Sequence, residues 1–154
     1  RFGARDAHPN PSPQDRVRRA GAAMPSVDTL VPVGAFALLV LAFAVKHLAA
    51  DFLFQTNWMA EGKQRPSAWL VPLCAHTGLH GLGTLLIALA VKPALWWLAL
   101  ADFAIHTAID RGKALVAQRT RLPATDARFW WLVGIDQFLH QVTHLGFAVM
   151  LAAA

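Results

Sequence analysis

The sequence predicts an all-α fold: a four-helix transmembrane bundle that follows a disordered N-terminal tail. The chain of 154 residues is 56% hydrophobic and only 15% charged, whereas a soluble domain is about 45–50% apolar and about 25% charged. Histidines and aspartates also recur at four-residue spacing, which places them on one face of each helix. Four apolar stretches carry them: Leu30–Ala50, Ala68–Val91, Ala94–Ile109 and Phe129–Ala153.

The N-terminal segment, residues 1–27, carries four prolines and no long apolar run. This composition predicts a disordered tail ahead of a helical membrane domain at residues 28–154. The tail lacks the apolar core of a secretory signal. Met24 is a candidate natural start, in which case residues 1–23 lie upstream of the native protein.

A membrane-spanning helix needs about 20 residues. The third apolar stretch is shorter, but its helical pattern continues through Gln118, and Pro93 predicts a tight turn before it. The first stretch alone would also fit a cleaved signal or a single anchor, but three more apolar stretches follow it and favour a multi-span protein. Gly78, Gly81 and Gly83 predict close helix packing along the second stretch.

Tryptophans and basic residues mark the expected membrane boundaries. All six tryptophans lie at the ends of the apolar stretches, as in an aromatic belt: Trp58, Trp69, Trp96, Trp97, Trp130 and Trp131. The loops after the first and third stretches are basic, so the positive-inside rule places them in the cytoplasm of a bacterial inner membrane if the chain starts at Met24. The net charge of +5 forms no basic, aromatic-rich face, and we expect no nucleic-acid partner.

The polar residues within the apolar stretches form one stripe on each helix. An aspartate near the centre of a membrane helix costs about 2.5–3.5 kcal/mol on insertion scales, so it should face the bundle interior and have a partner. In an antiparallel bundle, most of the stripes meet in the half of the membrane nearest the two basic loops. They comprise His47 and Asp51; His76 and His80; Asp102, His106 and Asp110; and Asp136, His140 and His144.

Imidazole and carboxylate ligands together suit Zn²⁺, Fe²⁺ or Mn²⁺. The single Cys74 excludes a cysteine-rich site and an internal disulfide. The predicted metal ligands are His47, Asp51, His76, His80, Asp110 and His140. Asp136 is a further ligand candidate and, with His106, a candidate general base. We expect the remaining polar residues to orient the ligands or contact substrate: Lys46, Gln55, Lys113, Gln137, Asp102 and His144.

Three functions are compatible with such a site. The first is a metal-dependent hydrolase in the lipid bilayer that acts on a lipid-linked or amphiphilic substrate. The second is a path for protons or divalent cations, which in so slim a bundle would require an oligomer. The third is a non-catalytic membrane partner whose polar residues only hold the helices together, at about 0.6 kcal/mol each. Because all four helices carry a polar stripe, we favour a metal site over residues that only hold the helices together.

The polar motifs resemble a known family. The sequence reads Lys46-His47-x-x-x-Asp51-Phe52-x-x-Gln55-Thr56, His76-x-x-x-His80, His106-x-x-x-Asp110-x-x-Lys113 and Asp136-Gln137-x-x-His140. This order and spacing resemble a bacterial family of small multi-helix membrane proteins catalogued as a domain of unknown function, over about Phe36 to Met150. The resemblance implies a membrane protein with these polar positions and carries no activity. Asp102 and His144 depart from the pattern. A more distant similarity to small inner-membrane metal-dependent hydrolases rests on the histidine–aspartate helices alone.

Overall fold

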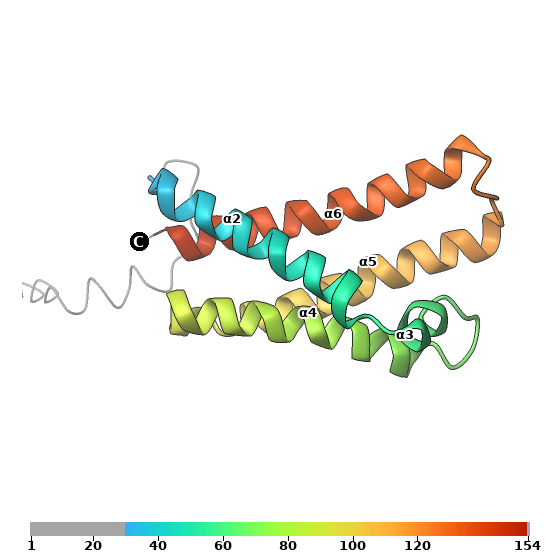
Figure 1. Cartoon of the computed structure of the whole chain (residues 1–154), viewed down its shortest axis with the longest axis horizontal. Coiled ribbons are helices and arrows are strands. Elements are labelled where there is room, and N and C mark those ends of the chain that lie inside the picture. The colour runs from blue at the N-terminus through green and yellow to red at the C-terminus, as the bar shows by residue number, and fades with distance from the viewer. Residues whose placement is uncertain (1–29, 154) are drawn as a thin grey trace, which may run out of the picture.

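The structure, a computed structural model, describes residues 30–153, and this part of the chain is all-α (Figure 1). The predicted tail, residues 1–27, lies outside the described residues, as does Met24. The four expected long helices are confirmed: α2 (Val33–Leu48), α4 (Leu70–Val91), α5 (Leu98–Thr120) and α6 (Ala127–Ala152).

The chain runs up and down through the bundle, so that α2 and α5 are antiparallel to α4 and α6 (Figure 1). The helix α2 continues into a π-helical segment, η1 (Ala49–Phe54), and the short helix α3 (Asn57–Gly62) follows. The most extensive helix contact is between α4 and α5, while α6 packs on both α2 and α5. Both predicted basic loops consequently lie at one end of the bundle, and the α4–α5 turn lies at the other (Figure 1).

The third long helix begins later than the sequence predicts. Residues Pro93–Leu95 form a 3₁₀ turn, η2, and α5 starts only at Leu98. Proline has no backbone N–H and favours the first turn of such an element, which explains why Pro93 begins the connection. The helical pattern past Ile109 is confirmed, since α5 continues through Thr120.

The start of α6 is fixed by an N-cap. The carboxylate of Asp126 accepts a hydrogen bond from the backbone N–H of Arg128 at 2.9 Å and pairs with its guanidinium at 2.7 Å. The side-chain hydrogen bond from Arg128 lowers the pKa of Asp126 to about 2. The cap is therefore charged at neutral pH and satisfies a backbone donor of the first helical turn.

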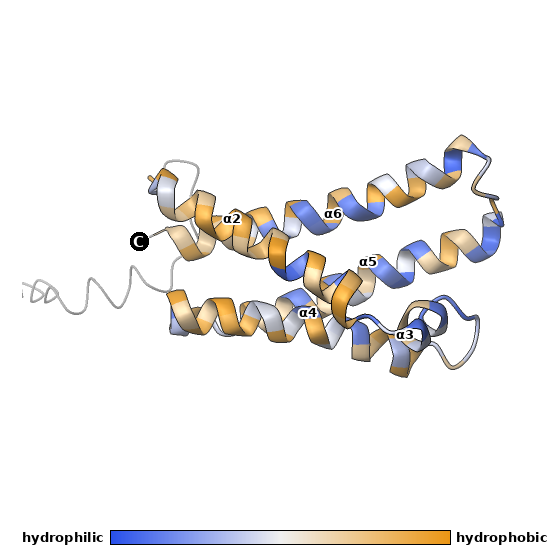
Figure 2. Cartoon of the chain, in the orientation of Figure 1, coloured by the Kyte–Doolittle hydropathy of each residue, from blue (hydrophilic) through white to orange (hydrophobic). Residues whose placement is uncertain are grey.

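Apolar side chains form a buried core only at the end of the bundle that holds the α4–α5 turn. Hydrophobic residues dominate this end in Figure 2, while hydrophilic residues appear in the middle of the bundle and toward the two loops at the other end. The buried apolar core consists of Leu39, Phe43, Ala88, Leu95, Leu98, Phe147, Ala148, Leu151 and Ala152. Beyond this apolar core, most of the buried residues are polar.

Many large apolar side chains face outward. Two helical segments, Val33–Phe54 and Leu70–Val91, are long and apolar enough to cross a membrane. Only 22% and 33% of the residues in their apolar windows are buried, whereas an apolar helix in the core of a soluble protein is mostly buried. The helices α5 and α6 are long enough but too polar to meet the same criterion, because they carry most of the buried histidines and aspartates.

The glycines of α4 differ in their surroundings. A Cβ atom at Gly83 would lie 2.5 Å from Cγ of Lys46, and one at Gly81 would lie 3.1 Å from the carbonyl oxygen of Ala99. A Cβ atom at Gly78 would meet nothing within 4 Å among the described residues. The prediction of close packing is thus confirmed for Gly81 and Gly83, and it is wrong for Gly78.

We expect Gly83→Ala to lower the free energy of unfolding in detergent micelles by roughly 1–3 kcal/mol, and with it the melting temperature. The reason is that the added methyl group displaces the aliphatic part of the Lys46 side chain. Gly78→Ala is the matched control and should leave stability unchanged or raise it, since alanine favours a helix by about 1 kcal/mol over glycine. Equal melting temperatures for the two variants would contradict the described packing.

Candidate metal centre

The ten histidines and aspartates of the four stripes converge inside the bundle. Nine of them are buried, and Asp51 is partly buried. Residues four apart share a helix face, so the spacing seen in the sequence directs every stripe inward once the four helices pack together. The expected convergence of these side chains is what the structure shows.

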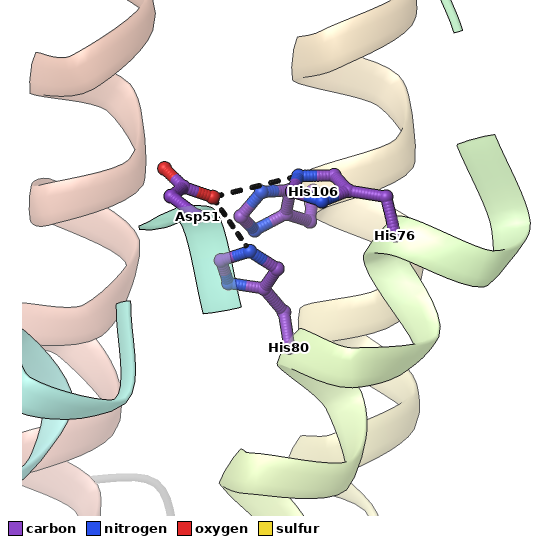
Figure 3. A group of neighbouring side chains, drawn as sticks. All are labelled: Asp51, His76, His80 and His106. Carbon is purple, nitrogen blue, oxygen red and sulfur yellow. Dashed lines mark hydrogen bonds and ion pairs between the residues drawn. The ribbon is translucent and has the colours of Figure 1, made fainter. Parts of the chain in front are cut away.

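Asp51 approaches the histidines from the π-helical segment η1. Its Oδ2 lies 3.2 Å from Nε2 of His47, while its Oδ1 lies 3.0 Å from Nε2 of His80 and 3.6 Å from Nε2 of His76. Figure 3 shows the carboxylate of Asp51 facing these two histidines of α4, with His106 beside them. Single π-helical turns are frequent at functional sites, and this one places one carboxylate against three imidazoles.

His106 lies at the centre of the imidazole cluster. The centroid of its ring is 3.8 Å from that of His80 and 3.8 Å from that of His140. Three sets of possible metal ligands share His106, and within each set one ligand atom per residue lies within 4.8 Å of the others. Two of these sets lie toward the pocket: Asp51, His76, His80 and His106; and His106, Asp110 and His140. The third set lies deeper and comprises Asp102, His106 and His144.

Asp110 lies between histidines of two different helices. Its Oδ2 is 3.4 Å from Nε2 of His76 on α4, and its Oδ1 is 3.7 Å from Nε2 of His140 on α6. Nδ1 of His140 is 2.9 Å from the carbonyl oxygen of Asp136, which can only accept, so Nδ1 carries the proton and donates. In the neutral ring, Nε2 then presents a lone pair toward Asp110, which is the arrangement typical of metal-binding histidines.

Lysines neutralise three of the four carboxylates. The lysine Nζ atoms lie 2.7 Å from carboxylate oxygens in the pairs Lys46–Asp102, Lys63–Asp110 and Lys113–Asp136. The fourth carboxylate, that of Asp51, has only histidines as ionisable partners among the described residues. The site therefore contains Lys46 and Lys113, which the sequence analysis expected to orient ligands or contact substrate, and a third lysine, Lys63.

A second polar group lies deeper in the bundle around Lys46. Its Nζ is 3.0 Å from Nε2 of His144, and the hydroxyl of Thr84 donates to Asp102 at 2.6 Å. The ring of His144 stacks on that of Phe43, with 5.3 Å between the centroids. Because Phe43 belongs to the apolar core, the polar interior ends at this depth.

The predicted orienting residues contact the site. The amide of Gln55 donates to the backbone carbonyl of Asp51 at 3.1 Å. The side-chain oxygen of Gln137 is 3.4 Å from Nε2 of His47, and its amide nitrogen donates to Asp136 at 3.2 Å. Both glutamines therefore lie where they can hold a ligand or a base in position.

Several buried ring nitrogens have no hydrogen-bond partner among the described residues. Buried polar atoms are normally paired, and leaving one unpaired costs about 1–3 kcal/mol. The unpaired nitrogens are Nδ1 of His47, His76, His80, His106 and His144, and Nε2 of His140. The interior therefore contains imidazole nitrogens that form no hydrogen bond with any of the described residues.

A pocket of about 230 Å³ reaches the cluster beside α3. Residues of α3 and the following loop form part of its wall, and α4, α5 and α6 contribute ionisable side chains. Among the lining residues are Lys63, His76, Asp110, Lys113, Asp136 and His140. The candidate ligands are therefore accessible from the end of the bundle that carries the basic loops.

The sequence did not single out three features of the site. Lys63 lies in a loop outside any periodic pattern, and Thr84 is one of many small polar residues in an apolar helix. The π-helical segment η1 has no clear sequence signal. The two candidate bases line the same pocket but differ in their neighbours: His106 belongs to sets of possible metal ligands, whereas Asp136 belongs to none of these sets and has a buried Oδ1 without a partner among the described residues.

Removal of Lys46 should destabilise the protein, because it leaves Asp102 buried without a counter-charge. We expect Lys46→Met to lower the free energy of unfolding by about 3–5 kcal/mol. The measurement is unfolding in detergent in the presence of a metal chelator. Lys92→Met is the control, since among the described residues the side chain of Lys92 donates only to the carbonyl oxygen of Ala153, outside the polar interior. Equal stability of the two variants would contradict a buried ion pair.

Comparison with curated proteins and with solved structures gives no match. A family model described as "Protein of unknown function (DUF3307)" matches residues 38–153. This range includes most of α2, all of α4, α5 and α6, and every candidate ligand. The chain therefore belongs to the DUF3307 family, a family of unknown function.

Proposed function

We propose that this protein is a membrane-embedded metalloenzyme that hydrolyses a phosphoryl ester of a lipid-linked or amphiphilic substrate. One observation carries the proposal. Four histidines and two aspartates from all four long helical segments come together beside an open pocket: Asp51, His76, His80, His106, Asp110 and His140.

The donor separations support a metal centre. Zn–N bonds of about 2.0–2.1 Å in a tetrahedral site place neighbouring donors roughly 3.3 Å apart. Oδ1 of Asp51 lies 3.0 Å from the nearest nitrogen of His80 and 3.6 Å from that of His76. Oδ2 of Asp110 lies 3.4 Å from His76. These separations match the requirement, and the ligand types suit zinc, iron or manganese.

The charge of the pocket favours an anionic substrate. Three carboxylates and two lysines line it, which gives a formal charge of −1. A divalent metal ion raises this charge to +1, so the loaded pocket attracts an anion. Lys63 and Lys113 supply ammonium groups at its wall, and lysine is a common ligand of phosphate groups. These lysines favour a phosphoryl over an acyl substrate.

The chemistry follows from the arrangement. A divalent metal ion held by the six donors would lower the pKa of a water molecule and polarise a phosphoryl oxygen. Asp136 is the group proposed to accept a proton from the attacking water. As the oxygen of that water bonds to phosphorus, the bond from phosphorus to the leaving oxygen would break, and Asp136 would return the proton to the leaving oxygen. Lys113, 2.7 Å from Asp136, holds this carboxylate in position. His106 serves as a ligand in this scheme.

The distribution of side chains supports a membrane setting. Large apolar residues cover the outside of the helices while charged residues fill the interior, which is the reverse of a soluble bundle. The tryptophans lie at helix ends, as aromatic belts require. The pocket lies at the end with the basic loops, which the positive-inside rule places in the cytoplasm if the chain starts at Met24. A substrate at this depth would have a polar head and an apolar anchor.

A second candidate function is the movement of protons or divalent cations. The deep group of Lys46, Asp102 and His144 favours it, because it extends the polar interior beyond the pocket. The apolar core around Phe43 and Phe147 then closes the described part of the interior. We therefore favour hydrolysis, and metal flux into proteoliposomes that is lost on His76→Ala would favour transport instead.

Protein purified from membranes should contain a transition metal in stoichiometric amount. His76→Ala removes a buried donor that faces both Asp51 and Asp110, and we expect it to lower metal affinity at least tenfold. Elemental analysis after dialysis measures both quantities. Cys74→Ala, on the same helix but outside the ligand sets, is the control and should retain the metal. Wild-type protein without metal would refute the proposed function.

The substrate class can be tested with two chromogenic probes, p-nitrophenyl phosphate and p-nitrophenyl butyrate, in detergent micelles. We expect metal-dependent cleavage of the phosphate ester only. Lys113→Met removes the partner of Asp136 and an ammonium group of the pocket, so it should lower kcat/KM at least tenfold. Arg128→Met, at the exposed end of α6, should not. Cleavage of butyrate alone would point to an acyl hydrolase.

A further inference from the structure

We propose that the site holds two metal ions bridged by the carboxylate of Asp110. This inference rests on the metal site of the proposed function, and it adds the number of ions and the ligand that joins them. A catalytic zinc ion usually takes three protein ligands and keeps one position open for water. The six donors beside the pocket exceed that number, and they divide into two groups.

The first group lies between α4 and the π-helical segment η1. Nε2 of His80 is 3.0 Å, and Nε2 of His76 is 3.6 Å, from the same oxygen of Asp51. These three atoms face one another from two elements, and Figure 3 shows them converging. They form the three-ligand set of one ion.

The second group lies between α5 and α6. The rings of His106 and His140 have centroids 3.8 Å apart, and both residues share a ligand set with Asp110. Nε2 of His140 is buried, has no hydrogen-bond partner among the described residues and carries a lone pair, because Nδ1 donates to the backbone. This nitrogen points to a ligand in its own right, independently of the first group.

Asp110 joins the two groups through separate oxygens. Oδ2 faces His76 of the first group at 3.4 Å, and Oδ1 faces His140 of the second group at 3.7 Å. One oxygen directed to each ion is the arrangement of a bridging carboxylate, and two-metal hydrolytic sites hold their ions about 3.5–4 Å apart. Lys63 contacts Oδ2 at 2.7 Å, so this oxygen already faces a cation, and a metal ion there would free Lys63 for the substrate.

The charge of the pocket is consistent with two ions. Its formal charge of −1 from three carboxylates and two lysines becomes +3 with two divalent cations. A phosphate monoester dianion and one hydroxide carry −3 together and would neutralise it. Two ions would also stabilise the attacking and the leaving oxygen at the same time, which a single ion cannot do equally well.

The test loads metal-free wild-type protein with Mn²⁺ alone, removes unbound ions and measures manganese per chain together with the electron paramagnetic resonance spectrum. We expect two Mn²⁺ per chain and the spectrum of an exchange-coupled pair. Asp110→Asn should reduce this to one ion with an uncoupled six-line spectrum, because a carboxamide does not bridge. Asp126→Asn is the matched control, since Asp126 only caps α6, and it should retain the coupled pair.

The outcomes separate this inference from the proposed function. One Mn²⁺ per wild-type chain with an uncoupled spectrum would overturn the two-ion centre and leave the metalloenzyme intact, whereas no bound metal would overturn both. Two coupled ions in Asp110→Asn would overturn the bridging role of Asp110. The wild-type measurement decides the ion count without any variant. Asp110→Glu keeps a carboxylate and tests the bridge if the asparagine variant does not fold. We expect it to keep two coupled ions, and two uncoupled ions in this variant would contradict a bridging carboxylate at this position.

Discussion

The structure depends on the pairing of buried charged groups across helices. Asp102 on α5 is matched by Lys46 on α2, and Asp136 on α6 is matched by Lys113 on α5. Charged groups in a low-dielectric interior are costly unless they have partners, so each such pair ties one helix to another. The same requirement explains why the helices present their apolar residues outward, since the inward faces are already occupied by polar ones.

The periodicity of the sequence predicted much of this arrangement. Four-residue spacing fixed the face of α5 on which His106 and Asp110 lie, and burial of that face is confirmed. The requirement that a buried aspartate have a partner predicted that the stripes meet. The number of long helices and the tight turn at Pro93 are also confirmed. These features depend on helix geometry and on side-chain polarity, and both can be inferred from the spacing and type of the residues in the sequence.

Other features depend on contacts between distant segments, and the sequence could not predict them. Lys63 pairs with a residue 47 positions away, and nothing near it in the chain marks that partner. Periodicity gives the face of a residue but not its neighbours on other helices, so it could not place His106 among the ligands and Asp136 at the pocket wall. The π-helical segment at Asp51 departs from regular helix geometry, and a pattern based on a regular helix does not reveal it.

In the proposed membrane setting, the apolar core at one end of the bundle would have an electrical consequence. In a membrane, voltage falls mainly across regions without water or mobile charge, and moving one elementary charge through the whole drop involves about 2.3 kcal/mol per 100 mV. The dry segment around Phe43, Phe147 and Leu151 would carry most of that drop, while the polar pocket remains near the potential of the adjacent solution. Ions would therefore enter the proposed centre from that solution with little dependence on the membrane potential. The reaction would accordingly not draw on the energy of that potential.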